Sequence, residues 1–107
     1  MNQLKRSECA ILPLVLKGKW YDMIASGEKK EEYRDVKPYW INRLSLFLDK
    51  ANSKARIVSF SRGYKKAGMF FEIVSMFRSG KSHHPEWGEP KTIHFIINLG
   101  QRVELVD

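Results

Sequence analysis

Charged side chains follow Gly27 at close spacing: Lys29, Glu32 and Arg34. Side chains of an extended segment alternate between two faces, so we expect Glu32 and Arg34 to point one way and Tyr33 the other. Lys29 lies in the preceding turn and could reach the face of Glu32. A lysine or arginine in a cleft can hold phosphate, and a carboxylate can accept hydrogen bonds from an exocyclic amine or a ribose hydroxyl. The group therefore predicts an RNA- or nucleotide-binding site.

The same residues could also carry out acid–base chemistry. If the protein is an enzyme, Lys29 with a lowered pKa is the candidate base, and Glu32 is its partner or activates a water molecule. The alternative is that the charged residues form a solvated strand surface, as charge runs commonly do.

A second basic segment surrounds Gly63 and contains Arg62, Tyr64, Lys65 and Lys66. Basic side chains beside an aromatic ring can hold a phosphate while a base stacks on the ring. Arg62 and Tyr64 are therefore candidate binding residues, although an ordinary exposed hairpin would have the same composition. Lys17, at the start of the first predicted helix, could extend this basic surface.

The other reactive side chains favour no metal or thiol chemistry. His83, His84 and Glu86 match no standard zinc spacing, and the only cysteine, Cys9, lies far from them. We therefore expect neither a metal nor a cofactor. Trp87 lies in the same Gly- and Pro-containing loop and could cover a cleft and stack on a base, or pin the loop to the domain.

The hydrophobic pattern predicts an α+β fold that places these residues. Trp20 and Trp40 recur with other apolar residues at helical spacing, which predicts two helices whose tryptophans lie in the core. Short apolar or β-branched runs predict the strands, and the order is not the regular alternation of a doubly wound sheet. We expect a flexible segment over residues 1–9 and one domain over residues 10–107. The predicted helices are 17–26 and a second one ending near Lys50, and the predicted strands are 10–16, 29–34, 56–60, 69–77, 92–99 and 103–106.

The stretch around Gly27, Lys29, Glu32 and Arg34 resembles the signature of the ASCH family, Gly-x-Lys-x-x-Glu-x-Arg after a strand and a short helix. The resemblance implies a small PUA-like β-barrel, mostly antiparallel and closed or partly closed, with helices beside an RNA-related cleft that the motif lines. Some small members of this family are amidohydrolases acting on acetylated cytidine, and ribonuclease activity is associated with others. The amidohydrolases have a threonine, their proposed nucleophile, where this chain has Glu32.

The overall charge agrees with a polyanionic partner. The 107 residues carry a formal net charge of +7, which attracts nucleic acid, although positive charge can also serve only solubility. No apolar stretch reaches bilayer length, so we expect no membrane partner. A single cysteine and the lack of a signal-peptide pattern favour the cytoplasm, and we expect a monomer.

Three functions remain open from the sequence. The first is a module that binds RNA or a nucleotide. The second is a small hydrolase acting on a modified nucleoside or on RNA. The third is a protein-interaction accessory domain that needs no nucleic acid.

Overall fold

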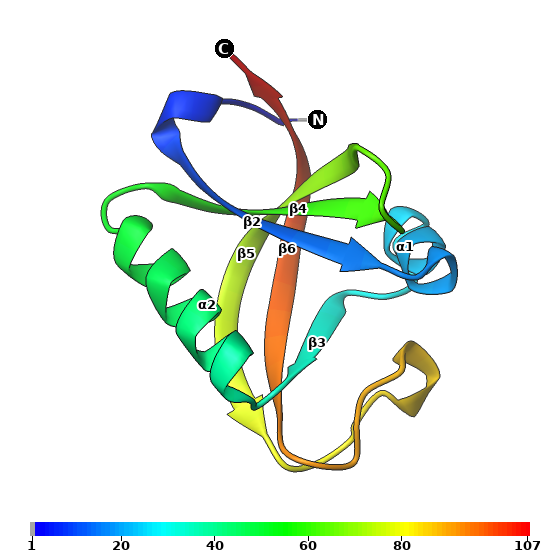
Figure 1. The fold of residues 1–107 in the computed structure, drawn as a ribbon. Coiled ribbons are helices and arrows are strands. Elements are labelled where there is room, and N and C mark those ends of the chain that lie inside the picture. The colour runs from blue at the N-terminus through cyan, green and yellow to red at the C-terminus, as the bar shows by residue number, and fades with distance from the viewer. Residues whose placement is uncertain (1) are drawn as a thin grey trace.

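Helices pack against one mixed sheet in the computed structural model, which describes residues 2–107. Figure 1 shows α2 (Pro38–Lys50) along one side of the sheet, next to β5 (Ala67–Ser79), and α1 (Gly18–Ala25) at the ends of β2 (Cys9–Leu16) and β4 (Ala55–Arg62). The other elements are β1 (Asn2–Lys5), β3 (Glu31–Asp35), β6 (His94–Val106) and the 3₁₀ turns η1 (Arg6–Glu8) and η2 (Pro85–Trp87).

The sheet is built around the two longest strands, β5 and β6. Its order is β1-β6-β5-β4-β2, and β3 also pairs with β6. The pairs β3–β6, β4–β5 and β5–β6 are antiparallel, whereas β1–β6 and β2–β4 are parallel. The register of β5 against β6 shifts between Phe71 and Ile73 and again between Ile73 and Ser75. Such bulges bend a strand, so the long pair curves around the core.

The expected fold class, a small α+β domain with two helices in its N-terminal half, is confirmed for residues 2–107. Of the expected closed or partly closed sheet, the closed form is excluded, because within this part of the chain no backbone ladder joins β2 to β3. Strand β3 is short and pairs with β6. Across the opening, the Nη2 of Arg34 in β3 donates to the carbonyl oxygen of Val15 in β2 at 3.0 Å. A side chain thus spans the place where a barrel would close.

The N-terminal segment contains a strand that the sequence did not predict. Asn2–Lys5 forms β1, with Asn2 opposite Val103 in the parallel pairing with β6. Met1 lies outside the described residues, and the flexibility of residues 1–9 in solution stays a prediction. At the other end, the two predicted strands 92–99 and 103–106 form one continuous strand, β6.

The core lies between the sheet and the two helices. Alternate residues of β2 are buried, as expected for a strand with one face on the core. Their side chains meet apolar residues from α1, α2, β4 and β6 in a single cluster. Its members include Leu12, Leu14, Ile24, Leu44, Phe47, Phe60 and Ile97.

The connection between α1 and β3 carries the motif into position. Gly27 has φ +86°, a left-handed conformation that favours glycine and stops the helix, as its sequence position predicted. The amide of Lys29 then donates to the carbonyl oxygen of Met23 at 3.0 Å. The chain therefore turns back along α1 before β3 begins at Glu31.

Candidate functional site

A cleft of about 330 Å³ opens where β2 and β3 fail to pair. Leu16 and Lys17 line it from the end of β2, and the motif lines it from the connection after α1 and from β3. Trp20 comes from α1, Trp40 from the first turn of α2, and Trp87 from the loop between β5 and β6. Segments far apart in the sequence therefore meet around this opening.

Lys29 lies at the floor of the cleft with its side chain 1% exposed. Its Nζ donates to the carbonyl oxygen of Trp87 at 2.6 Å and lies 3.4 Å from Oε1 of Glu32. The same nitrogen lies 4.4 Å from the ring centre of Tyr33 and 5.1 Å from that of Trp20. Burial lowers the pKa of the Lys29 ammonium, and the nearby Glu32 carboxylate opposes this shift only in part.

Glu32 links Lys29 to Arg34. Glu32 is only 4% exposed, and its Oε2 accepts a hydrogen bond from Nη1 of Arg34 at 2.5 Å. Nη1 of Arg34 also donates to the carbonyl oxygen of Tyr33 at 2.9 Å. The Nε of Arg34 is buried and has no hydrogen-bond partner among the described residues. A buried N–H without a partner is costly, and a ligand could reach this nitrogen only if the Arg34 side chain moved.

Aromatic side chains form much of the wall. All three tryptophans of the chain, Trp20, Trp40 and Trp87, line the cleft together with Tyr33. The guanidinium of Arg34 lies 5.0 Å from the ring centre of Trp40, and the His84 ring stacks on Trp87 at 4.0 Å with 13° between the planes. The site therefore combines flat apolar surfaces with a charged floor, as nucleobase-binding sites do.

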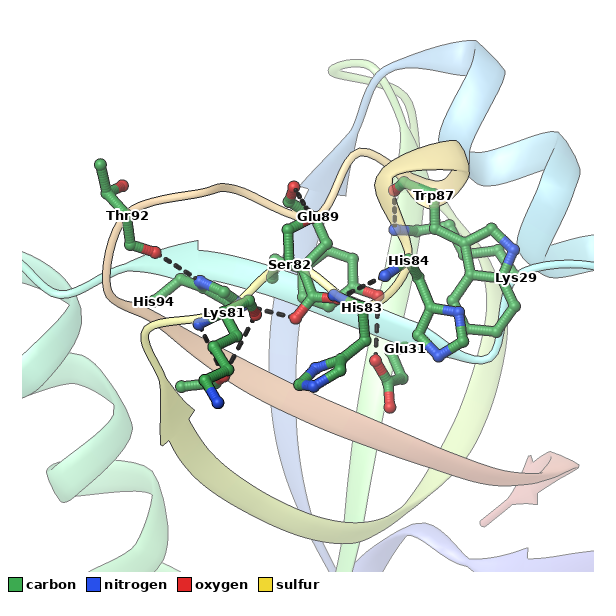
Figure 2. Close-up of polar contacts among 12 residues, drawn as sticks. Lys29, Glu31, Lys81, Ser82, His83, His84, Trp87, Glu89, Thr92 and His94 are labelled. Carbon is green, nitrogen blue, oxygen red and sulfur yellow. Dashed lines mark hydrogen bonds and ion pairs between the residues drawn. The ribbon is translucent and has the colours of Figure 1, made fainter.

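The loop that carries Trp87 is held from within by a buried carboxylate (Figure 2). Oε1 of Glu89 accepts hydrogen bonds from the amides of His83 and His84, each at 2.8 Å. Its Oε2 lies 2.7 Å from Nε2 of His94, and both side chains are 0% exposed. Figure 2 also shows Lys29 reaching the Trp87 carbonyl oxygen at the other end of the loop.

The loop also contacts α1 closely. Gly88 has φ +80°, and a Cβ atom there would lie 2.7 Å from Cζ2 of Trp20. Only glycine combines this backbone conformation with this approach to the ring. Glu89 and Gly88 together set the position of Trp87 at the cleft.

The structure brings together four of the six predicted binding residues at this cleft: Lys17, Lys29, Glu32 and Arg34. Arg62 and Tyr64 do not line it. The guanidinium of Arg62 pairs with the carboxylate of Asp22 at 3.2 Å, and Tyr64 is 99% exposed.

The aromatic residues of the wall come from several expectations. Tyr33 was expected on the face opposite Glu32; its hydroxyl donates to Glu31, and its ring, beside the Lys29 ammonium, also lines the cleft. Trp20 and Trp40 were expected in the core. Trp40 packs against the core cluster and also lines the cleft, whereas Trp20 is a half-buried residue of the wall. Helical spacing predicts an apolar side but does not distinguish a core from a cleft.

The buried roles of Glu89 and His94 were missed, since their pairing depends on how the loop closes. Among residues 2–107, no group of three or more His, Cys, Asp or Glu side chains is arranged to hold a metal ion. In the same part of the chain, every helix is too short or too polar to cross a membrane.

Comparison with known proteins gives a likeness in fold. No family model matches the chain, and no curated protein matches its sequence. Among solved structures, the chain is similar to the S128A mutant of ZmASCH from Zymomonas mobilis, an ASCH protein. The sequence identity is 16%, the TM-score is 0.47, and the match covers 92% of this chain and 71% of that one.

Proposed function

We propose that the cleft binds one nucleotide unit, a base with its sugar and phosphate, in RNA or as a free nucleotide. The observation that carries the proposal is the meeting of Lys29, Glu32 and Arg34 at the floor of a cleft walled by aromatic rings. A volume of about 330 Å³ lies at the lower end of the range for small-molecule sites, roughly 300–1,000 Å³. This size favours a single nucleotide over a duplex.

The carboxylate of Glu32 provides the means to read a base edge. Each of its oxygens is paired with one cation, Oε1 with Lys29 and Oε2 with Arg34. A carboxylate has about four lone-pair sites, so acceptor capacity remains for an N–H of the base. The charge pairs fix the orientation of the carboxylate, and little entropy is lost when a ligand binds.

The cations suit the sugar-phosphate part of the ligand. The floor carries two cations and one carboxylate, and Lys17 is exposed at the rim. The Arg34 side chain lines the cleft and is 16% exposed, so its guanidinium can donate to a phosphate or hydroxyl oxygen, and such charge-assisted hydrogen bonds are the stronger kind.

Tryptophan fluorescence offers a direct test, because every tryptophan of the chain lines the cleft. Titration with each of the four ribonucleoside 5′-monophosphates should change the emission, and a base stacked on an indole should quench it. Glu32→Gln should weaken binding roughly 10- to 100-fold, the effect of losing a hydrogen bond to a charged group. Lys17→Ala should weaken the binding of nucleotides more than the binding of the matching nucleosides.

The control for these variants is Lys54→Ala, which changes an exposed lysine at the start of β4. Thermal unfolding identifies any variant that loses its fold. Unchanged affinity in both folded cleft variants would mean that this cleft is not the nucleotide site.

A second candidate function is hydrolysis of a modified nucleoside or of RNA. The observation that favours it is the lowered pKa of buried Lys29, 3.4 Å from the Glu32 carboxylate, since a lysine with a lowered pKa can act as a general base. Purified protein should be incubated with acetylated cytidine and with RNA, beside Glu32→Gln. Turnover that persists in Glu32→Gln would exclude this pair as its source.

A further inference from the structure

The turn between β4 and β5 presents an aromatic ring and two lysines that the fold does not use. Tyr64 is 99% exposed, and Lys65 and Lys66 are also exposed. An aromatic ring that stays in water contributes almost nothing to burial. We call Tyr64, Lys65 and Lys66 the hairpin tip.

The hairpin tip is fixed beside the cleft. The amide of Gly63 donates to the carbonyl oxygen of Leu16 at 2.7 Å, and Leu16 and Lys17 both line the cleft. Figure 1 shows the same arrangement, with the β4–β5 turn beside α1 and the end of β2.

Close packing also ties the hairpin to α1. Both Nε and Nη2 of Arg62 pair with the Asp22 carboxylate. A Cβ atom at Gly18 would lie 2.5 Å from the Arg62 guanidinium, and one at Gly68 would lie 2.0 Å from the Tyr21 hydroxyl oxygen. The two glycines let the hairpin and the helix approach closely, so the tip has a defined position relative to the cleft.

We infer that the hairpin tip is a second contact site for single-stranded RNA, next to the nucleotide that the cleft holds. A neighbouring base stacks on Tyr64, while Lys65 and Lys66 pair with backbone phosphates. Lys17 lines the cleft directly after Leu16, the residue to which the hairpin is bonded. The inference rests on the proposed function of the cleft and names its ligand class, an RNA strand rather than a free nucleotide. Positive charge beside an exposed ring fits a strand, whose phosphates and bases alternate.

The experiment compares a mononucleotide with a strand. The probes are the four ribonucleoside 5′-monophosphates, followed by tryptophan fluorescence, and a fluorescein-labelled random-sequence RNA octamer, followed by anisotropy. The variants are Tyr64→Ala, Tyr64→Phe and Lys65→Ala/Lys66→Ala. The matched control is Lys50→Ala/Lys54→Ala, which removes two exposed lysines near the opposite end of β4.

The wild type should bind the octamer more tightly than any mononucleotide. Tyr64→Ala should weaken octamer binding at least about fivefold, from the loss of one stacked base, and Tyr64→Phe should retain it. Lys65→Ala/Lys66→Ala should reduce the slope of log K against log salt by about 1.4, or about 0.7 for each phosphate contact on a single strand. Mononucleotide binding should stay unchanged in all hairpin variants, and the control should bind both probes like the wild type.

The outcomes separate the two proposals. If Glu32→Gln weakens mononucleotide binding but the hairpin variants bind the octamer like the wild type, the hairpin inference is wrong and the cleft proposal stands. If the wild type binds neither probe, both fail. A hairpin that instead captures a protein, with no effect of its variants on the octamer, also overturns the inference.

Discussion

Glu89 holds the loop that forms one wall of the cleft, so its replacement should affect stability and ligand binding together. Glu89→Ala removes the acceptor for the amides of His83 and His84, each at 2.8 Å, and the partner of His94 at 2.7 Å. The carboxylate and the imidazole are both 0% exposed.

The expected loss of stability is about 3–5 kcal/mol. Breaking one side of a buried ion pair costs about that much, and each amide left without a partner in a buried place costs about 1–3 kcal/mol. The loop can limit the cost by detaching, which lets the amides reach water. Domains of this kind have about 5–15 kcal/mol of total stability, and a loss of about 3 kcal/mol lowers Tm by roughly 12–24 °C.

Glu89→Gln is the matched control. A carbonyl oxygen of glutamine can still accept from the two amides, and its NH₂ group can donate to Nε2 of a neutral His94 whose Nδ1–H donates to the carbonyl oxygen of Thr92, 2.7 Å away. We expect this variant to lose much less stability than Glu89→Ala. Urea denaturation measures both, and amide hydrogen exchange of residues 80–93 shows whether the loop detaches locally.

The two variants also predict a dependence on pH. Burial favours the neutral acid, but hydrogen bonds from His94 and from the amides of His84 and His83 outweigh it and hold the pKa of the Glu89 carboxyl below its usual value. A depressed pKa contributes stability that is present above the unfolded value, about 4.3, and is lost as the pH falls through the folded one. The stability gap between wild type and Glu89→Gln should therefore narrow as the pH falls below about 4.3.

The reasoning is refuted if Glu89→Ala unfolds at the same urea concentration as the wild type and its loop amides exchange at the same rate. Glu89 would then be a surface residue of a loop held by other contacts. If Glu89→Ala and Glu89→Gln instead lose the same large amount of stability, the negative charge of Glu89, and not its position as a hydrogen-bond acceptor, is what stabilises the loop.

Three further predictions concern single sites. Gly88→Ala should lower the free energy of unfolding by about 1–3 kcal/mol, because φ +80° and the approach of Trp20 both disfavour a Cβ atom. Gly80→Ala is the control: no atom lies within 4 Å of a Cβ at that position, so the free energy of unfolding, measured by urea denaturation for both variants, should change by less than about 0.5 kcal/mol. Burial lowers the pKa of the Lys29 ammonium from 10.5, so in alkaline solution the unfolded chain binds more protons than the folded protein. The wild type should therefore gain stability relative to Lys29→Met as the pH rises towards 10.5. Urea midpoints of the two proteins that move in parallel between neutral and alkaline pH would contradict this. Burial raises the pKa of the Cys9 thiol, so a thiol reagent should modify native protein far more slowly than protein in urea.

The motif could be placed from the sequence because its geometry is local. Gly27 stops the helix, and residues two apart on a short strand share a face. Glu32 and Arg34 accordingly meet in an ion pair. Tyr33 follows the same rule, since its hydroxyl donates to Glu31, two residues away, at 2.9 Å; what the rule could not show is that Lys29 reaches its ring.

Features that depend on distant parts of the chain could not be predicted in the same way. The pairing of Asn2 with Val103 joins the two ends of the sequence, and only the segment 103–106 was predicted as a strand. The contact of Glu89 with His94 exists only because the loop closes on itself. A buried polar pair leaves no periodic signal, so composition alone suggested an ordinary polar loop.

Arg34 connects the open sheet with the cleft. One nitrogen of its guanidinium satisfies the carbonyl oxygen of Val15, which lacks a strand partner at this edge, and another holds Glu32. Had β3 paired with β2 through its backbone, the strands would lie about 4.8 Å apart and no space for a ligand would remain between them. A long side chain instead bridges the edges and leaves a hollow with a charged floor. The opening of the sheet and the candidate nucleotide site are therefore one structural feature, and a substitution such as Arg34→Ala would affect both.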